Sequence, residues 1–412
     1  MGKGELTLEK EILKKGKWEE ITLSKVAKFR PSKTQVRDLS NLNCSFVPMK
    51  DLNEKEIEFI PKEERKIGDV YKGYTYFENN DVLLAKVTPC FQNRKAGVAK
   101  DLVNGIGFGS SEFFVFRPSE KILPEFIYYF FMTEEFINKG VANMSGAVGL
   151  RRVTNDYVKN VKIPLPPLSE QRRILSKLDT LFAEIDASLA LIDQNIAQAE
   201  ALKLSVLDEE FGKIRKEENI FKIKDLAFTK SGATPRRSIK SYWGGNIPWL
   251  KSGELNDNKN IVENLEYITQ KGLENSSAKI FPKGTLLMAM YGATAGKLGI
   301  LGIEACTNQA VCSIQNDKGL FIEEYLYYYL LMIREKIILD SFGGAQPNIS
   351  KRYIDNLDVP LPVKKERQQK IVQKLDALFA EIDALVLDYT QKRENLEALK
   401  SSLLDQAFKG EL

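Results

Sequence analysis

The chain has 412 residues, with 60 Lys and Arg against 56 Asp and Glu, so its formal net charge is only +4. This length predicts two or three domains, and the small net charge excludes a histone-like polycation, so any affinity for nucleic acid must come from local basic patches. The sequence has no histidine and its four cysteines include no Cys-x-x-Cys pair, which excludes histidine triads, imidazole zinc sites and thioredoxin-type redox sites.

The N-terminal twenty residues are charged throughout and lack the apolar core of a signal peptide. The most apolar stretch runs from Tyr325 to Ile333, nine residues against the roughly 20 that a membrane helix needs. We therefore expect a soluble, cytoplasmic protein.

Residues 1–168 are expected to form a domain of mixed strands and helices. Short apolar runs at 81–85 and 113–117 are bounded by Gly, Asn and Pro, which is typical of strands. An aromatic helical segment, 124–136, follows them. Strands followed by helices predict an α+β fold rather than a doubly wound parallel sheet.

Residues 169–212 are expected to form one long helix. From Ile174 to Val206 apolar residues recur every three or four positions without Gly or Pro. Ser169 follows a proline-rich turn and marks the start, while Gly212 marks the end. At 1.5 Å per residue, about 40 residues make a rod of roughly 60 Å.

The second region, 213–363, and the final segment, 364–412, repeat this order. Ten of eleven residues match between 177–187 and 374–384, at a spacing of 197 positions. Upstream of the helices the match persists but weakens. The chain is therefore a direct tandem of two similar units, each a variable domain followed by a nearly invariant helix.

Each long helix carries an apolar stripe, broken in the second copy only by Arg393. Burying a large apolar side chain stabilises by roughly 1.5 to 3 kcal/mol, so the two stripes are expected to pack together. We predict an antiparallel coiled coil, with the two α+β domains related by a pseudo-twofold axis. The alternative is that each helix packs on its own domain.

Basic residues are segregated along the chain. Residues 21–37 carry five positive side chains and no acid, 82–100 carry four and no acid, and 230–253 carry five and no acid among Tyr and Trp. Such segregation in a nearly neutral chain predicts a phosphate-facing surface in each domain. For any single loop, a solvated turn is the alternative.

Most of the predicted DNA contacts lie in these stretches, and the others lie in the glycine-containing segments 292–297 and 344–349. Phosphate contacts are expected from Lys25, Arg30, Lys86, Arg94, Lys95, Arg236, Arg237 and Lys297. Groove contacts are expected from Thr88, Trp249, Thr294, Gln346 and Asn348. Asn and Gln suit the edge of adenine, and Arg suits guanine.

Enzyme signatures come close and fail. Residues 292–298 have three residues between the glycines instead of four, and Leu298 stands where a P-loop needs Ser or Thr. Asn246-Ile-Pro-Trp249 is one residue away from the motif with which amino-methyltransferases hold a flipped base, so a self-contained adenine methyltransferase is one alternative. A coiled-coil adaptor without a DNA role is another.

The order of motifs resembles the specificity subunit of type I restriction-modification systems. The shared motifs are Pro-Leu-Pro-Pro-Leu-Ser-Glu-Gln-Arg-Arg-Ile at 164–174, Leu-Asp-x-Leu-Phe-Ala-Glu-Ile-Asp in both helices, Ser-Gly-Ala-Thr-Pro at 231–235, Ile-Pro-Trp-Leu at 247–250, Gly-Ala-Thr-Ala-Gly-Lys at 292–297 and Gly-Ala-Gln-Pro-Asn-Ile at 344–349. The resemblance spans essentially the whole chain. It is weaker in the first domain, where Thr-Pro-Cys-Phe at 88–91 and Gly-Ala-Val-Gly-Leu at 146–150 depart from it.

The resemblance implies a non-catalytic subunit that binds a bipartite double-stranded DNA target. It implies target-recognition domains at 1–168 and 213–363, each reading one half, and spacer helices at 169–212 and 364–412 that set the distance between the halves. Two methylation subunits would dock on this chain, and restriction subunits would join through them. No cofactor is expected in this chain, because S-adenosylmethionine, ATP and Mg²⁺ would belong to the partner subunits.

Overall fold

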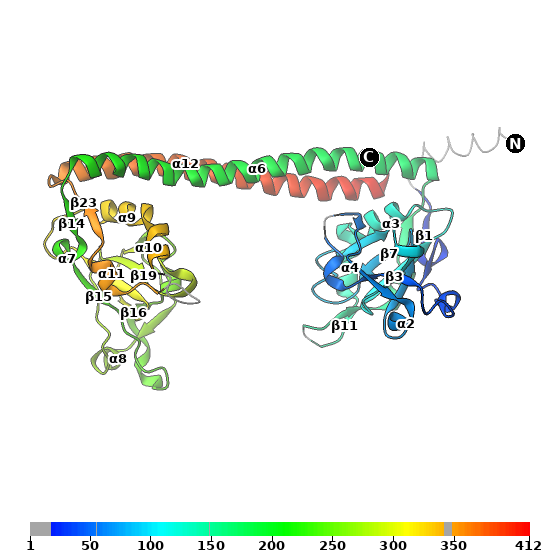
Figure 1. Cartoon of the computed structure of the whole chain (residues 1–412), viewed down its shortest axis with the longest axis horizontal. Coiled ribbons are helices and arrows are strands. Elements are labelled where there is room, and N and C mark those ends of the chain that lie inside the picture. The colour runs from blue at the N-terminus through cyan, green and yellow to red at the C-terminus, as the bar shows by residue number, and fades with distance from the viewer. Residues whose placement is uncertain (1–17, 55, 148, 342–347) are drawn as a thin grey trace. The chain divides into compact units, whose positions relative to one another are not determined.

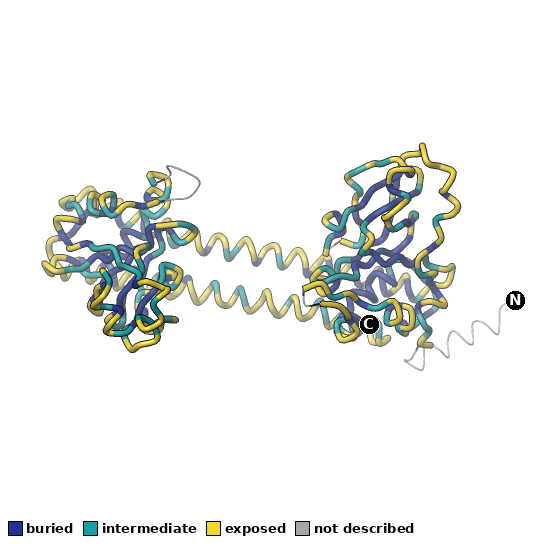
Figure 2. Tube along the Cα trace, turned by 90° about the horizontal axis from the view of Figure 1, so that it is seen from below, coloured by how far each residue is buried: buried dark blue, intermediate teal, exposed yellow. Residues whose placement is uncertain are grey.

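The computed structural model describes residues 18–412 except 55, 148 and 342–347 (Figure 1). The chain divides into two compact units, one made of Met1–Ile192 with Gln391–Leu412 and the other of Asp193–Thr390. Each unit contains a globular part with a buried core, shown in dark blue in Figure 2, and a stretch of each of two long helices. Among the described residues, no helix combines the length and the apolar character that crossing a bilayer requires.

The first unit is built on a five-stranded sheet in the order β2-β10-β7-β8-β4. These strands are β2 (Ala27–Phe29), β10 (Phe113–Pro118), β7 (Val82–Ala85), β8 (Ala96–Ala99) and β4 (Glu58–Phe59). A second sheet contains β5 (Glu63–Lys66), β3 (Asn43–Val47), β9 (Ile106–Gly109) and β6 (Thr75–Glu78), and two short pairs are β1 (Glu20–Thr22) with β13 (Lys162–Pro164) and β11 (Met144–Ser145) with β12 (Arg152–Val153). The α-helices of the globular part are α2 (Ile67–Val70), α3 (Pro124–Phe131), α4 (Glu134–Ala142) and α5 (Asn155–Asn160).

The apolar run of β7 is continuous because both faces of the strand are buried. Val82 and Leu84 pack in the cluster that contains Phe126 of α3. Leu83 and Ala85 point the other way, into a cluster formed with the second sheet. A strand covered on both faces has no solvent side, so the polar alternation of a surface strand is missing.

The second unit repeats this architecture, with a five-stranded sheet in the order β15-β22-β19-β20-β17. These strands are β15 (Phe228–Ser231), β22 (Val311–Gln315), β19 (Leu286–Ala289), β20 (Leu298–Leu301) and β17 (Asn258–Ile261). A three-stranded sheet contains β18 (Glu266–Ile268), β16 (Trp243–Leu250) and β21 (Cys306–Thr307), and β14 (Ile220–Lys222) pairs with β23 (Asp358–Pro360). The α-helices of the globular part are α7 (Ile223–Leu226), α8 (Gln270–Glu274), α9 (Glu323–Met332), α10 (Arg334–Asp340) and α11 (Lys351–Asp355).

The two units share strand register as well as strand order. Glu20 pairs with Pro164 in the first unit, and Ile220 pairs with Pro360 in the second. The α+β fold class predicted from the sequence is confirmed, and the tandem repeat extends over the globular parts as well as the helices.

The long helices are α6 (Leu168–Glu217) and α12 (Lys365–Lys409). In the first unit, Arg173 donates to the Leu412 carbonyl at 3.0 Å and Lys400 binds Asp186 at 2.7 Å. In the second unit, Lys203 binds Asp383 and Lys374 binds Glu210, both at 2.5 Å. Residue numbers rise along α6 as they fall along α12, so the stretches of the two helices run antiparallel within each unit.

Both helices also pack on the globular parts. In the first unit, the Phe408 ring of α12 lies 4.7 Å from Phe126. In the second unit, Phe211 of α6 lies 5.3 Å from both Tyr325 and Tyr329 of α9. The two sequence alternatives, helix on helix and helix on domain, therefore occur together, and the core of each unit includes a helix from the other half of the repeat.

Two details of the helix prediction are corrected. α6 continues five residues beyond Gly212 to Glu217, because the flanking residues Phe211 and Ile214 are buried in the second unit and hold the helix through the glycine. Within the apolar stripe predicted from Ile174 to Val206, Leu202 is half exposed, whereas Leu207, one residue beyond that range, is fully buried. The predicted boundaries between recognition domains and spacer helices stay predictions.

Each long helix is fixed to a globular part by a buried glutamine near its first turn. Gln171 accepts a hydrogen bond from the Leu123 amide at 2.9 Å and donates to the carbonyls of Lys121 and Pro166 at 3.0 and 2.9 Å. Gln368 repeats the arrangement with the amide of Ile322 and the carbonyls of Leu320 and Pro362, at 2.8, 3.1 and 2.8 Å. Both glutamines are fully buried.

Candidate nucleic-acid interface

Segments from three parts of the first unit meet beside the β7–β8 turn. They are Arg30 after β2, residues 86–95 between β7 and β8, and residues 149–153 before α5. Val87 and Arg152 form an isolated antiparallel bridge, and the Val153 amide donates to the Lys86 carbonyl at 2.9 Å. We refer to these segments as the first loop edge.

The second unit forms the same arrangement. Tyr291, between β19 and β20, forms an antiparallel bridge with Asn348, and the Ile349 amide donates to the Met290 carbonyl at 2.9 Å. Asn348 therefore occupies the position that Arg152 occupies in the first unit. The second loop edge comprises residues 231–237, 290–297, 305–310 and 348–349.

An aromatic surface gathers basic side chains at the first loop edge. The Arg30 guanidinium lies 5.2 Å from the ring centre of Phe29 and 5.5 Å from that of Phe114. The Lys86 amine lies 5.7 Å from Phe114 and donates to the Ser111 carbonyl at 2.7 Å. Burial lowers the pKa of Lys86, and the positive charges of Arg30 and Arg152 lower it further.

Arg152 belongs to this cluster, although the sequence prediction missed it. Its Nε and Nη2 atoms donate to the two carboxylate oxygens of Glu112, each at 2.9 Å. Arg152 lies outside the three acid-free basic stretches of the sequence, and its partner Glu112 lies 40 positions earlier in the chain. A doublet of arginines beside a glycine-rich segment is the only local signal.

The other predicted contacts of the first unit do not form a single basic cluster. Lys25 is exposed in a short turn between β1 and β2. Thr88 donates to the Gly149 carbonyl at 3.2 Å and accepts from the Arg151 amide at 3.1 Å, so its hydroxyl holds the loop edge together. Arg94 binds Glu134 of α4, which neutralises its charge.

Lys95 and Lys297 occupy equivalent positions in the two units. The Lys95 carbonyl accepts from the Ala85 amide at 2.9 Å, and the Lys297 carbonyl accepts from the Ala289 amide at 2.8 Å. Each lysine therefore stands at the end of the turn that follows the central strand, and both side chains are half-buried. The two predicted phosphate contacts therefore lie at the same place in the repeat.

Hydrogen bonds connect the segments of the second loop edge. The Met290 amide donates to the Ala310 carbonyl at 2.7 Å, and the Ala233 amide donates to the Thr307 carbonyl at 2.9 Å. The Thr234 hydroxyl reaches the Gln309 amide oxygen at 2.5 Å. The exposed side chains of Gln309 and Asn348 therefore belong to one continuous edge.

Arg236 and Arg237 continue this edge toward β16. Arg236 is exposed, whereas the Arg237 guanidinium lies 3.7 Å from the Trp243 ring centre and binds Glu266. Lys251 binds the same carboxylate. The pKa of Glu266 lies below its usual range, chiefly because Arg237 donates a hydrogen bond to it.

The predicted groove contact of Trp249 is corrected by its burial. Only 1% of its surface is exposed, and its indole nitrogen donates to the Ala233 carbonyl at 3.0 Å. Trp249 therefore supports the segment that carries Arg236 and Arg237. The Asn246–Trp249 motif lies in β16, where Pro248 pairs with Tyr267, rather than at the edge of a doubly wound sheet, which disfavours the methyltransferase alternative.

The other details of the predicted contacts in the second unit concern the segments 292–297 and 344–349. Thr294 donates to the Tyr291 carbonyl at 3.3 Å, and the Lys297 amine reaches the Asn256 side chain at 3.4 Å. Asn348 is exposed. Gln346 lies outside the described residues.

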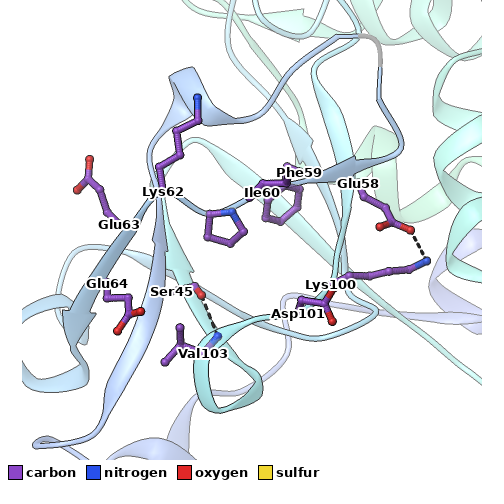
Figure 3. A pocket seen from close by; sticks show the side chains of 11 residues that line it. Ser45, Glu58, Phe59, Ile60, Lys62, Glu63, Glu64, Lys100, Asp101 and Val103 are labelled. Atoms are coloured by element: carbon purple, nitrogen blue, oxygen red, sulfur yellow. Dashed lines mark hydrogen bonds and ion pairs between the residues drawn. The ribbon is translucent and has the colours of Figure 1, made fainter.

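A pocket of about 370 Å³ in the first unit lies apart from the predicted contacts (Figure 3). Its titratable lining consists of Glu58, Lys62, Glu63, Glu64, Lys100 and Asp101. Glu58 binds Lys100 at 2.5 Å, and Ser45 accepts from the Val103 amide at 3.0 Å, as the dashed lines in Figure 3 show. The excess of carboxylates makes this pocket a poor site for phosphate. Within the described parts of the chain, no group of three acidic or cysteine side chains is placed to hold a metal ion.

Comparisons with known proteins bear on the whole chain. The family described as Type I restriction modification DNA specificity domain matches residues 15–196 and 215–388. The EcoAI specificity subunit of a type I restriction enzyme from Escherichia coli is 36% identical over 198 residues, which is 47% of this chain and 33% of that protein. The chain thus matches about a third of the length of this relative.

Two solved structures share the fold. A chain from a structure of the type I R-M system, concerning complex assembly and conformational transition, aligns with a TM-score of 0.81 at 20% identity and covers 96% of this chain and 98% of its own. The HsdS subunit from Thermoanaerobacter tengcongensis aligns with a TM-score of 0.59 at 20% identity, over 96% and 97% of the two chains. Because the family match covers most of the sequence in two successive copies, this chain belongs to the type I restriction modification DNA specificity domain family.

Proposed function

We propose that this protein is the subunit that binds a bipartite double-stranded DNA target for a type I restriction-modification complex. One observation carries the proposal: two units with the same strand order each gather basic and amide side chains on a loop edge. Basic side chains position a protein on phosphates, and amide and guanidinium groups distinguish base edges. As a specificity subunit the chain is not itself an enzyme.

Each loop edge would read one half of the target. The residues at equivalent positions differ in type, as Arg152 and Asn348 do, so the two halves would differ in sequence. In this proposal α6 and α12 form a coiled-coil spacer that sets the gap between the halves. The antiparallel contacts within each unit support that role.

Two methylation subunits would dock on exposed faces of the long helices. Leu202 of α6 and Leu399 of α12, which are 197 positions apart in the repeat, are 50% and 45% exposed. Equivalent exposed leucines in two repeats suit two copies of one partner, because binding that covers apolar surface is favourable. Leu202→Asp and Leu399→Asp are expected to weaken co-purification with the methylation subunits. Restriction subunits would join through those partners.

The cofactors of the complex would sit elsewhere. S-adenosylmethionine, ATP and Mg²⁺ are assigned to the partner subunits, and none to this chain. We place the assembled complex in the cytoplasm, where its DNA is.

Sequencing of methylated bases, in cells with and without the gene, tests the proposal. We expect a split motif that is methylated only when the gene is present. A variant with Lys95→Glu and Lys297→Glu should lose methylation of the motif, because phosphate contacts are lost in both units. Retention of the motif after this double charge reversal would favour the adaptor alternative. Methyl transfer by the purified chain alone would favour the methyltransferase alternative.

A further inference from the structure

We infer that Arg152 is a specificity-determining residue of the first unit. Its side chain contacts a guanine of the target, and Glu112 orients it for that contact. The inference rests on the proposed DNA-binding function and adds the base and the residue that selects it. It is carried by the geometry of one ion pair, by the exposure of its arginine and by the equivalence of its position with Asn348.

The ion pair between Arg152 and Glu112 fixes one edge of the guanidinium. Nε donates to one carboxylate oxygen and Nη2 to the other, both at 2.9 Å. A bidentate pair of this kind is planar and sets the orientation of the whole group. The pKa of Glu112 lies below its usual range, mainly because of the hydrogen bond from Arg152, so the carboxylate stays charged at neutral pH.

The opposite edge of the guanidinium stays available. Arg has five N–H donors, and Arg152 uses three of them, two on Glu112 and one on the Leu150 carbonyl at 3.4 Å. Within the part of the chain that the structure describes, the remaining two donors of Arg152 form no hydrogen bond. The Arg152 side chain is 47% exposed, against 26% for Glu112, so the arginine is the more solvent-accessible partner of the pair.

Both partners of the pair are held by the backbone. The bridge from Arg152 to Val87 fixes one side. On the other side, the Glu112 carbonyl accepts from the Lys86 amide at 3.0 Å, and the Glu112 amide donates to the Ser110 hydroxyl at 3.2 Å. Arg152 therefore loses little conformational freedom on binding, which favours selective contacts over adaptable ones.

The surrounding charge would bring DNA to this position. Lys86 lies 3.8 Å from the Glu112 carboxylate, and Arg30 shares the Phe114 ring with Lys86. Three cations against one carboxylate leave a net positive edge, which suits phosphates on either side of a base pair. Guanine presents O6 and N7 side by side in the major groove, and the two remaining donors of an oriented arginine match them.

The equivalent position of the second unit carries a side chain that suits adenine instead of guanine. Asn348 forms the same bridge, with Tyr291, and its amide suits N6 and N7 of adenine. One backbone site thus presents a guanine reader in one unit and an adenine reader in the other. An ion pair that only stabilised the fold would not require a half-exposed arginine at this matched position.

The test selects DNA from a randomised duplex library with the full chain bound to its methylation subunits. The wild-type complex should prefer guanine at one position of one half-site by about 5- to 150-fold, the range of a bidentate arginine contact. Arg152→Ala should reduce that preference to near onefold and leave the other half-site unchanged. Arg152→Gln should move the preference to adenine, since the glutamine amide matches its edge.

Arg65→Ala is the matched control. Arg65 also pairs with a glutamate, Glu63, at 2.8 Å and is 38% exposed, but it lies on β5 of the second sheet. Its loss should leave the selected motif unchanged. Retention of the other half-site in each variant shows that the complex is folded.

The outcomes separate this inference from the proposed function. A wild-type motif that Arg152→Ala and Arg152→Gln leave unchanged at every position, with or without a uniform loss of affinity, overturns the role of Arg152 and leaves DNA recognition intact. A wild-type complex that selects no motif overturns the proposed function and this inference together.

Discussion

At the scale of single residues, Gln171 shows how a polar side chain stabilises a helix junction. Its side-chain amide forms hydrogen bonds with three backbone groups that would otherwise be buried without a partner. Each such group costs about 1 to 3 kcal/mol when it is unsatisfied. We therefore expect Gln171→Ala to lower the free energy of unfolding of the first unit by about 2 to 4 kcal/mol. Urea unfolding of the full chain measures this, and hydrogen exchange should show faster exchange of the Leu123 amide.

Gln373→Ala is the control for that substitution, because Gln373 is exposed on α12. Its effect should stay within about 0.5 kcal/mol, as for most surface changes. Equal stabilities for the two variants would contradict the role assigned to Gln171.

The sequence could indicate residue types and local segments, but not which residues meet. The repeat placed Gln171 inside the shared motif without revealing that it is buried. Trp249 was interpreted as a groove contact because it stands in a basic stretch, yet its indole lies in the core of the three-stranded sheet. Arg152 was overlooked because its partner Glu112, in the turn before β10, is 40 positions away in the chain. The burial of a residue and its partners from distant parts of the chain are set by the tertiary structure, and local sequence patterns do not reveal them.

At the scale of elements, α9 contains four buried tyrosines. Burial raises the pKa of Tyr325, Tyr327, Tyr328 and Tyr329 above the ordinary value near 10. Above pH 10 the unfolded chain loses these phenolic protons while the folded chain keeps them. Their contribution is complete below pH 10 and is lost as the pH rises beyond it, by about 1.4 kcal/mol per pH unit for each tyrosine.

We expect the urea midpoint of the second unit to fall steeply between pH 10 and pH 12. Tyr325→Phe should make that fall shallower, because one titrating group is removed, although it also loses the hydrogen bond to the Pro360 carbonyl at 2.6 Å. Midpoints measured from pH 8 to pH 12 give both slopes. Parallel curves for the two proteins would show that Tyr325 does not contribute.

Elements were predicted best where their pattern is local. The runs at 81–85 and 113–117 became β7 and β10, and the aromatic segment at 124–136 became α3 followed by α4. The end of α6 was placed too early, because the helix-breaking tendency of Gly212 is outweighed by packing of Phe211 and Ile214. Strand order and register depend on hydrogen bonds between distant segments and left no trace in the pattern of either copy.

At the scale of the whole molecule, the two globular parts keep one architecture with few shared residues. The bridges of Val87 with Arg152 and of Tyr291 with Asn348 use backbone groups only, so different side chains can occupy these positions without changing the bridge. The helices differ, because their apolar faces and the buried glutamines depend on side-chain identity. This contrast explains why the repeat is plain in the helices and faint elsewhere.

The proposed spacer role leads to a prediction about the length of α6 and α12. The ion pairs of Asp186 with Lys400 and of Lys203 with Asp383 fix the register within each unit. Deleting residues 195–201 and 385–391 removes seven residues between these pairs on both helices, or roughly 10 Å. A heptad keeps the helix faces within about 20° of their original direction, so the packing on each side should survive.

DNA selection with the shortened protein should return both half-sites unchanged, separated by a gap about three base pairs shorter, since one base pair rises by roughly 3.4 Å. Affinity should fall, because three base pairs also turn one half-site around the duplex axis relative to the other. A protein with Ala substituted at the exposed positions Leu385 and Leu387 controls for lost side chains, and its gap should equal that of the wild type. If the shortened protein selected the original gap, the distance between the half-sites would have to be set outside the paired helices.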